Sequence, residues 1–174
     1  MRLRKDVQDN TVFGKVDAQH VLGLSVTSVV FSGAIFGFVC STMWGLDRAD
    51  PRVAIAAMQA MNASVRNAVL FPAFFLTPVV LGLTVAAAYF SGCGAAAFWF
   101  GAAAAVYLVF GLMLTLTVNV PMNEALAASA VPDDVAAAPD IWLDYSQRWQ
   151  VWNQVRALAS GIALVFAALG LARL

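Results

Sequence analysis

Charged residues are scarce in this chain. Only 11% of its 174 residues are Asp, Glu, Lys or Arg, against about 25% in an ordinary soluble domain. The ten basic and ten acidic residues cancel to a formal net charge of zero, so we expect no nucleic-acid partner, which would require a basic surface. The apolar share of 61% excludes intrinsic disorder, which requires low hydrophobicity. Two classes remain: a soluble protein with very apolar buried helices, or a membrane protein.

Residues that bind metals or activate nucleophiles are also few. His20 is the only histidine, and the chain has two cysteines. No His and Cys cluster has the ligand spacing of a metal site, and no phosphate loop or dinucleotide fingerprint is present. A catalytic serine would lack a well-placed histidine base. We therefore expect neither a metal ion nor a cofactor.

The charged residues leave four long gaps. No Asp, Glu, Lys or Arg occurs in 21–44, 67–90, 95–121 or 157–172. A transmembrane helix needs roughly 20 apolar residues, within a range of about 17–25, and only the fourth gap falls slightly short. The first gap is too long for the ~7–15-residue apolar region of a signal peptide and lacks a cleavage site. The pattern predicts an all-α, four-helix integral membrane bundle, preceded by a polar segment at 1–20.

Four spans would put both chain termini on the same side of the membrane. Each pole carries five Lys and Arg residues, but Arg66, Arg148 and Arg156 at the opposite pole belong to patterned helix rather than to loops. The positive-inside tendency then predicts cytoplasmic termini in a plasma (inner) membrane. Cys40 and Cys93 would lie on opposite faces of the bilayer, beyond the ~7 Å between Cα atoms that a disulfide allows, so we expect two free thiols.

Two helices are expected to extend beyond the bilayer at the pole opposite the termini. The first begins at Asp50 and Pro51, which are typical of an N-cap and a first helical residue. No breaker follows until Pro72, so this helix should run into the second span, with kinks at Pro72 and Pro78.

The second of these helices follows a predicted loop at 125–139. Asp140 is its candidate N-cap, and the stretch to Ala172 contains no proline. Such a helix would be roughly 50 Å long at ~1.5 Å per residue, whereas the hydrocarbon core is only ~30 Å thick. Its first part should therefore stand outside the membrane or in a polar interior.

This second helix carries a continuous stripe of aromatic and polar side chains. Its members fall on one helical face: Trp142, Tyr145, Trp149, Trp152, Asn153 and Arg156. An interfacial aromatic belt explains one or two rings near one depth, whereas this stripe covers about four turns. The stripe is thus either such a belt or a face that binds an aromatic ligand.

More polar residues are predicted at the same pole. They are Gln59, Asn62 and Arg66 on one helical face, and Asn119, Asn123 and Glu124 at the end of the third span. Amides and arginines at membrane depth are costly unless they meet one another or line a cavity. These residues form either a polar network that holds the bundle together or a binding site, and the two roles can coexist.

Three short motifs carry a family resemblance. They are Met58-Gln59-Ala60-Met61-Asn62, Val118-Asn119-Val120-Pro121-Met122-Asn123-Glu124, and Trp149-x2-Trp152-Asn153-x2-Arg156. Together they resemble the anthrone oxygenase-like family of small four-helix integral membrane proteins, over roughly residues 20–174.

The resemblance implies a cofactor-independent oxygenase that oxidises a flat phenolic or polycyclic aromatic, from an anthrone to a quinone, with O2. Trp142, Tyr145, Trp149 and Trp152 would then hold the substrate. Arg66 and Arg156 would stabilise a developing phenolate. Gln59, Asn62, Asn119, Asn123 and Asn153 would orient its oxygen atoms, and Glu124 or Asp144 would serve as the general base.

Two other functions stay open at this point. The chain could be a non-catalytic membrane protein that binds a lipophilic ligand or a partner protein. A transporter is the weaker alternative, because spans free of charge give little support for ion coupling. The partners expected from the oxygenase interpretation are the lipid bilayer, a hydrophobic aromatic molecule and O2, and the sequence leaves assembly into a homo-oligomer open.

Overall fold

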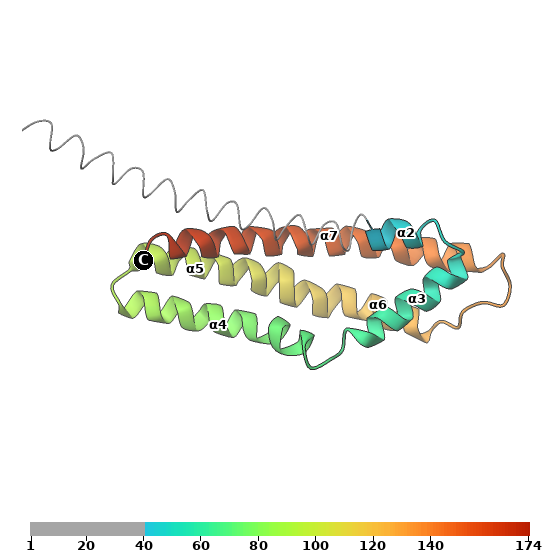
Figure 1. The fold of residues 1–174 in the computed structure, drawn as a ribbon, viewed down its shortest axis with the longest axis horizontal. Coiled ribbons are helices and arrows are strands. Elements are labelled where there is room, and N and C mark those ends of the chain that lie inside the picture. The colour runs from blue at the N-terminus through green and yellow to red at the C-terminus, as the bar shows by residue number, and fades with distance from the viewer. Residues whose placement is uncertain (1–40) are drawn as a thin grey trace, which may run out of the picture.

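The computed structural model describes residues 41–174, and these residues form helices without any strand. Three long rods lie side by side (Figure 1). The first is α4, Leu70–Phe90, and the third is α7, Ala138–Leu171. The middle rod is a continuous run of α5 (Gly94–Val106), the π-helical segments η2 (Tyr107–Met113) and η3 (Thr115–Asn119), and α6 (Val120–Ala128). The short α2, Trp44–Leu46, and α3, Pro51–Ser64, complete the fold at one end.

Three of the described helices have the length and apolar composition of membrane spans: Leu70–Phe90, Gly94–Ala128 and Ala138–Leu171. The prediction of an all-helical membrane bundle is thereby confirmed. The predicted segment 1–20 and nearly all of the predicted span 21–44 lie outside the described residues, so a bundle of four spans stays a prediction.

The helix that starts at Pro51 does not continue into the second span, so that part of the prediction is wrong. The start itself is as predicted, because the Asp50 carboxylate accepts a hydrogen bond from the backbone N–H of Arg52 at 2.9 Å. The helix ends at Ser64 because of Asn67. Its amide donates to the Ser64 carbonyl oxygen at 2.8 Å and accepts from the backbone N–H groups of Val69 and Leu70. One side chain thus caps the end of α3 and the start of α4.

The boundaries around the last loop also differ from the prediction. Helix α6 extends to Ala128, so the loop covers 129–137 rather than 125–139. Pro121, where the predicted third span stops, does not end the middle rod. It stands in the first turn of α6 directly after η3, where a register change already disrupts the regular hydrogen bonds. Helix α7 begins at Ala138 with Pro139 in its first turn, and Asp140 lies inside that turn rather than at the cap.

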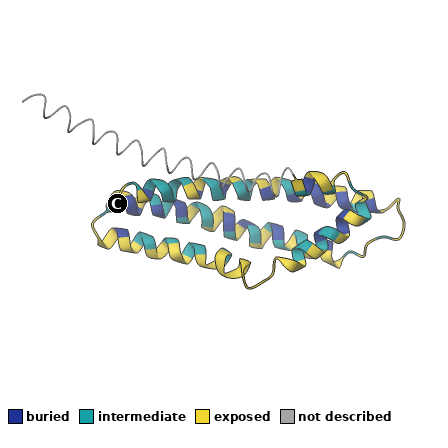
Figure 2. Cartoon of the chain, viewed as in Figure 1, coloured by how far each residue is buried: buried dark blue, intermediate teal, exposed yellow. Residues whose placement is uncertain are grey.

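The rods are packed tightly at two places. Near the turn between α4 and α5, Gly92 has φ of 78°, a conformation that favours glycine, and Ala88, Ala96, Ala97 and Phe100 form a small core. The larger core lies at the other end, where α2, α3, α6 and the start of α7 meet. Helix α4 is exposed along most of its length (Figure 2). The polar residues singled out from the sequence lie toward this end of the rods, in or near α3, η3, α6 and the first half of α7.

Candidate functional site

Asn123 on α6 is the centre of a hydrogen-bond network within the larger core. Its Oδ1 accepts from the Tyr145 hydroxyl at 2.8 Å and from the Trp149 indole N–H at 2.9 Å. The Asn62 amide donates to the same Tyr145 hydroxyl at 3.3 Å. Three predicted site residues from three helices thus meet Tyr145, as the polar-network interpretation requires.

A second hydrogen-bond network, which the sequence analysis missed, holds the start of α7 against the chain that follows α2. The Asp47 carboxylate accepts from the Trp142 indole N–H at 3.1 Å, the Ser146 hydroxyl at 2.6 Å and the Gln150 amide at 2.8 Å. The signal was present in the sequence, because residues 142, 146 and 150 form an i, i+4, i+8 row on one helical face.

These two networks hold most of the aromatic stripe inside the protein. The side chains of Trp142, Tyr145 and Trp149 are only 5%, 6% and 4% exposed, and adjacent rings pack against one another. They belong to the protein core and not to an interfacial belt. Trp152 is not part of this core and is 38% exposed. The structure therefore brings together three of the four predicted rings.

Two other predicted residues have local structural partners. The Gln59 amide donates to the carbonyl oxygens of Leu126 and Ser129, at 2.8 and 2.9 Å, and so satisfies acceptors at the end of α6. Arg66 and Glu124 form an ion pair of 3.7 Å with both side chains more than half exposed. That pair lies at the rim of the protein rather than among the buried residues.

A second group of predicted residues lies farther from the larger core, along the same two rods that contain Asn123 and Trp149. The hydrogen bond between Asn123 and Trp149 sets the register of two antiparallel helices. One turn further from the larger core, Asn119 on η3 and Asn153 on α7 follow at four-residue spacing, and η3 contacts α7. Arg156 donates to the Asn153 Oδ1 atom. We call Asn119, Asn153 and Arg156 the inner layer.

The inner layer is polar but incompletely paired. Asn119 and Asn153 are 3% and 4% exposed. Among residues 41–174, neither polar atom of the Asn119 side chain has a hydrogen-bond partner, and none of the ion pairs includes Arg156. Tyr107, which the sequence analysis did not select, lies within electrostatic range of Arg156 and donates to the Phe74 carbonyl oxygen at 3.2 Å. Tyr107 stands at the start of η2, and this position marks it as a candidate site residue because π-helical turns are frequent at functional sites.

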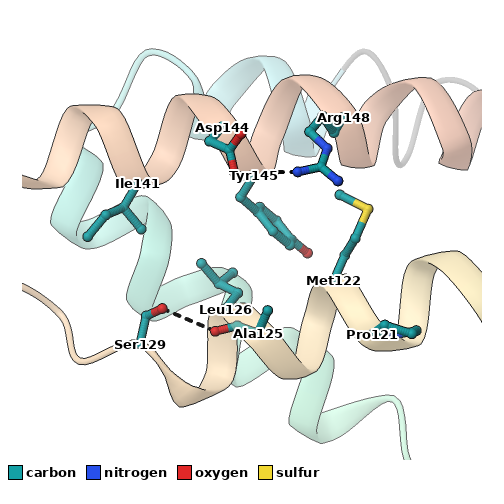
Figure 3. Close-up of a pocket in the computed structure, with 9 residues that line it drawn as sticks. All are labelled: Pro121, Met122, Ala125, Leu126, Ser129, Ile141, Asp144, Tyr145 and Arg148. Carbon is teal, nitrogen blue, oxygen red and sulfur yellow. Dashed lines mark hydrogen bonds and ion pairs between the residues drawn. The ribbon is translucent and has the colours of Figure 1, made fainter.

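An open pocket of about 470 Å³ lies between α6 and the start of α7 (Figure 3). Tyr145 is the one predicted binding residue that lines it, beside the predicted base candidate Asp144. Asp144 is exposed and pairs with Arg148 at 3.6 Å. Within the described part of the chain, no group of three His, Cys, Asp or Glu side chains is placed to hold a metal ion.

Comparison with known families decides the relationship that the motifs indicated. Residues 61–166 match the sequence model of the family described as anthrone oxygenase, and this match covers more than half of the chain. The protein belongs to the anthrone oxygenase family. The matched region contains Asn62, Asn123 and the whole inner layer, whereas Gln59 and Asp47 precede it. No curated protein and no solved structure matches this anthrone oxygenase family member.

Proposed function

We propose that this protein is a membrane-embedded oxygenase that oxidises a flat phenolic aromatic of the anthrone type to a quinone, with O2 and without a cofactor. The observation that carries the proposal is the state of the inner layer. The partly buried Arg156 guanidinium forms no ion pair with an acidic residue among the described residues, and the buried Asn119 side chain of the same layer has no hydrogen-bond partner there. Family membership supports an oxygenase-like activity.

The electrostatics of Arg156 give the site its affinity for an anion. A cation taken out of water without a counter-ion is costly, and an anionic ligand offsets that cost. A deprotonated anthrone is such a ligand, since its negative charge is shared between the ring carbon and the oxygen. Arg156 would therefore favour the deprotonated form and stabilise the transition state that leads to it.

Asn119 would orient the same molecule. Its side chain offers both an N–H donor and a carbonyl acceptor, which suit the carbonyl and hydroxyl groups of a hydroxylated anthrone. Asn153 holds the guanidinium of Arg156, so it is proposed as a positioning residue. The buried rings of Trp142, Tyr145 and Trp149 are held by hydrogen bonds within the core, and we assign them to the support of the site rather than to stacking on the substrate.

The proposed reaction balances without an external reductant. The anthrone methylene group loses one proton to give a stabilised carbanion, which transfers an electron to O2. The two radicals combine through a new C–O bond, and one proton completes a hydroperoxide. The carbon then loses its second proton while the O–O bond breaks and hydroxide leaves, which a proton converts to water. One oxygen atom ends in the new carbonyl group and the other in water, and the methylene carbon supplies all four electrons.

The proton acceptor is assigned to water in this scheme. Glu124 and Asp144 were the candidate bases, but their side chains are 61% and 76% exposed and face Arg66 and Arg148. Neither carboxylate belongs to the inner layer, and a general base must lie within hydrogen-bond reach of the proton that it removes. Stabilisation of the anion by Arg156 thus replaces a strong base as the main source of rate.

Measurement of anthrone oxidation by the purified protein in lipid nanodiscs tests this proposal. We expect it to convert 1,8-dihydroxyanthrone to the anthraquinone faster than empty nanodiscs do, with one O2 consumed per quinone and no added cofactor. With ¹⁸O2, one labelled atom should enter the quinone. A rate equal to that of empty nanodiscs over a panel of anthrones and hydroquinones would contradict the proposal.

A non-catalytic role is the second candidate function, and one observation favours it. Most of the predicted binding residues are satisfied by hydrogen bonds within the protein, as in a purely structural network. Under this alternative the protein would bind an anthrone or a partner protein without turnover. Saturable binding of the anthrone in the absence of any quinone product would support it.

A further inference from the structure

The open pocket between α6 and α7 is separate from the inner layer, because none of Asn119, Asn153 and Arg156 lines it. We propose that this pocket is a second ligand site, which binds an aromatic carboxylate. The inference does not depend on the oxygenase activity, since it rests on the shape, the walls and the charges of the pocket itself.

The walls of the pocket suit a flat apolar body. Met122 and Leu126 on α6 face Ile141 on α7, and the Tyr145 ring points from α7 toward α6 between them (Figure 3). The Tyr145 hydroxyl accepts a hydrogen bond from Asn62 and donates one to Asn123, and these two bonds keep the ring in place. The ring is only 6% exposed and packs against Trp142 and Trp149, so it offers an aromatic ligand a small but fixed contact at little entropic cost. The volume of about 470 Å³ lies within the ~300–1,000 Å³ range of small-molecule sites.

The mouth of the pocket supplies a cation for a carboxylate. Arg148 lines the pocket and pairs with Asp144 at 3.6 Å, with side chains that are 64% and 76% exposed. Such an exposed pair is weak, so Asp144 can be displaced into water at small cost. The planar guanidinium then matches a carboxylate with two parallel hydrogen bonds. An apolar body and one planar anionic group at its end describe an aromatic carboxylate.

The binding test uses anthracene-9-carboxylate, a fluorescent probe, with the full chain in nanodiscs and empty nanodiscs as background. We expect saturable binding with one site per chain. The neutral probe anthracene-9-methanol should bind at least ten-fold more weakly, as should decanoate, which has the anionic group without the flat body. Equal binding of either comparison ligand would overturn the assignment of ligand class.

Matched variants locate the probe. Ala125 lines the pocket, whereas Ala127 is exposed on the same helix and does not. Ala125→Trp should abolish binding of the carboxylate, and Ala127→Trp should leave it unchanged. Arg148→Gln should weaken binding about ten-fold, since a charge-assisted hydrogen bond is lost, while Arg173→Gln at the other end should have no effect. Equal losses in the two tryptophan variants, or unchanged affinity in Arg148→Gln, would overturn the proposal. Because no turnover is measured, inactivity toward anthrones would leave this result standing.

Discussion

The Asn123 side-chain oxygen accepts a hydrogen bond from the Trp149 indole N–H at 2.9 Å, and this contact fixes α6 against α7. Trp149 is part of the larger core, and Asn123 is partly buried beside it. Each lies one helical turn from the inner layer along its rod. The register that this contact sets also decides how Asn119 on η3 lies relative to Asn153 on α7. The hydrogen bond between Asn123 and Trp149 therefore connects the packing of the core with the geometry of the proposed site.

Loss of the Asn123 side chain should destabilise the protein strongly. Asn123→Ala would leave the Tyr145 hydroxyl and the Trp149 indole N–H, both buried donors, without an acceptor. We expect the free energy of unfolding, measured by SDS titration in mixed micelles, to fall by about 2–4 kcal/mol. Gln154→Ala, which removes an exposed amide from α7, should change it by less than about 0.5 kcal/mol. Equal effects of the two variants would show that Asn123 does not hold the core.

Gly170 tests the close packing between α5 and α7. A Cβ atom there would lie 3.0 Å from the Phe100 ring, and that ring is 6% exposed. Gly170→Ala should therefore lower the free energy of unfolding by about 1–3 kcal/mol through overpacking. Gly82 in α4 has no neighbour within 4 Å of the same position, so Gly82→Ala should raise it by about 0.5–1 kcal/mol. Stabilisation by both substitutions would contradict the close approach of Phe100 to Gly170.

Asp50 should make the stability of the folded protein depend on pH in one direction. Hydrogen bonds from the Arg52 side chain and backbone lower the pKa of the Asp50 carboxyl. Its contribution to stability is therefore complete above the pKa of the unfolded chain, near ~3.9, and is lost as the pH falls through the lower pKa of the folded state. The Asp50→Asn variant keeps an acceptor at the N-cap. Between about pH 5 and about pH 3, its thermal midpoint should fall less than the thermal midpoint of the wild type. Parallel pH curves would refute the interaction.

Cys93 tests the predicted orientation. The cysteine is a free thiol at the turn between α4 and α5 and is partly buried. In a Cys40→Ser background, a membrane-impermeant maleimide should label Cys93 from the cytoplasmic side of sealed vesicles. Labelling from the outer side alone would reverse the topology inferred from the distribution of Lys and Arg.

The sequence predicts long-range features of this fold better than local ones. Gaps between charges mark the rods, because a membrane span needs an uninterrupted apolar run. The break at Asn67 is hard to predict, because an amide that bonds backbone groups on both sides of a turn looks like any polar residue in a helix. Pro121 resembles a helix end in the sequence because proline usually breaks a helix. The π-helical turns before it make room for the proline, but they leave no mark in the composition.

The candidate site was predicted as a set of residues but not as an arrangement. Helical spacing correctly grouped Trp142, Tyr145 and Trp149, yet spacing cannot tell whether a ring faces a ligand or a hydrogen-bond acceptor on another helix. The division into a satisfied network around Asn123 and an inner layer with unpaired groups depends on the register between α6 and α7. That register is a tertiary property, and only the structure supplies it.

Arg156 provides the most direct test of the central claim. We compare kcat/KM for quinone formation from 1,8-dihydroxyanthrone in the wild type, Arg156→Gln, Asn119→Ala and Gln154→Ala, after checking that each variant keeps its thermal midpoint. Arg156→Lys, which retains the charge, is measured beside Arg156→Gln and should lose less turnover. We expect a loss of about 100-fold for Arg156→Gln, because the anion loses its cation. We expect a smaller loss for Asn119→Ala and no change for Gln154→Ala. A folded Arg156→Gln variant with the turnover of the wild type would show that Arg156 does not stabilise the anion.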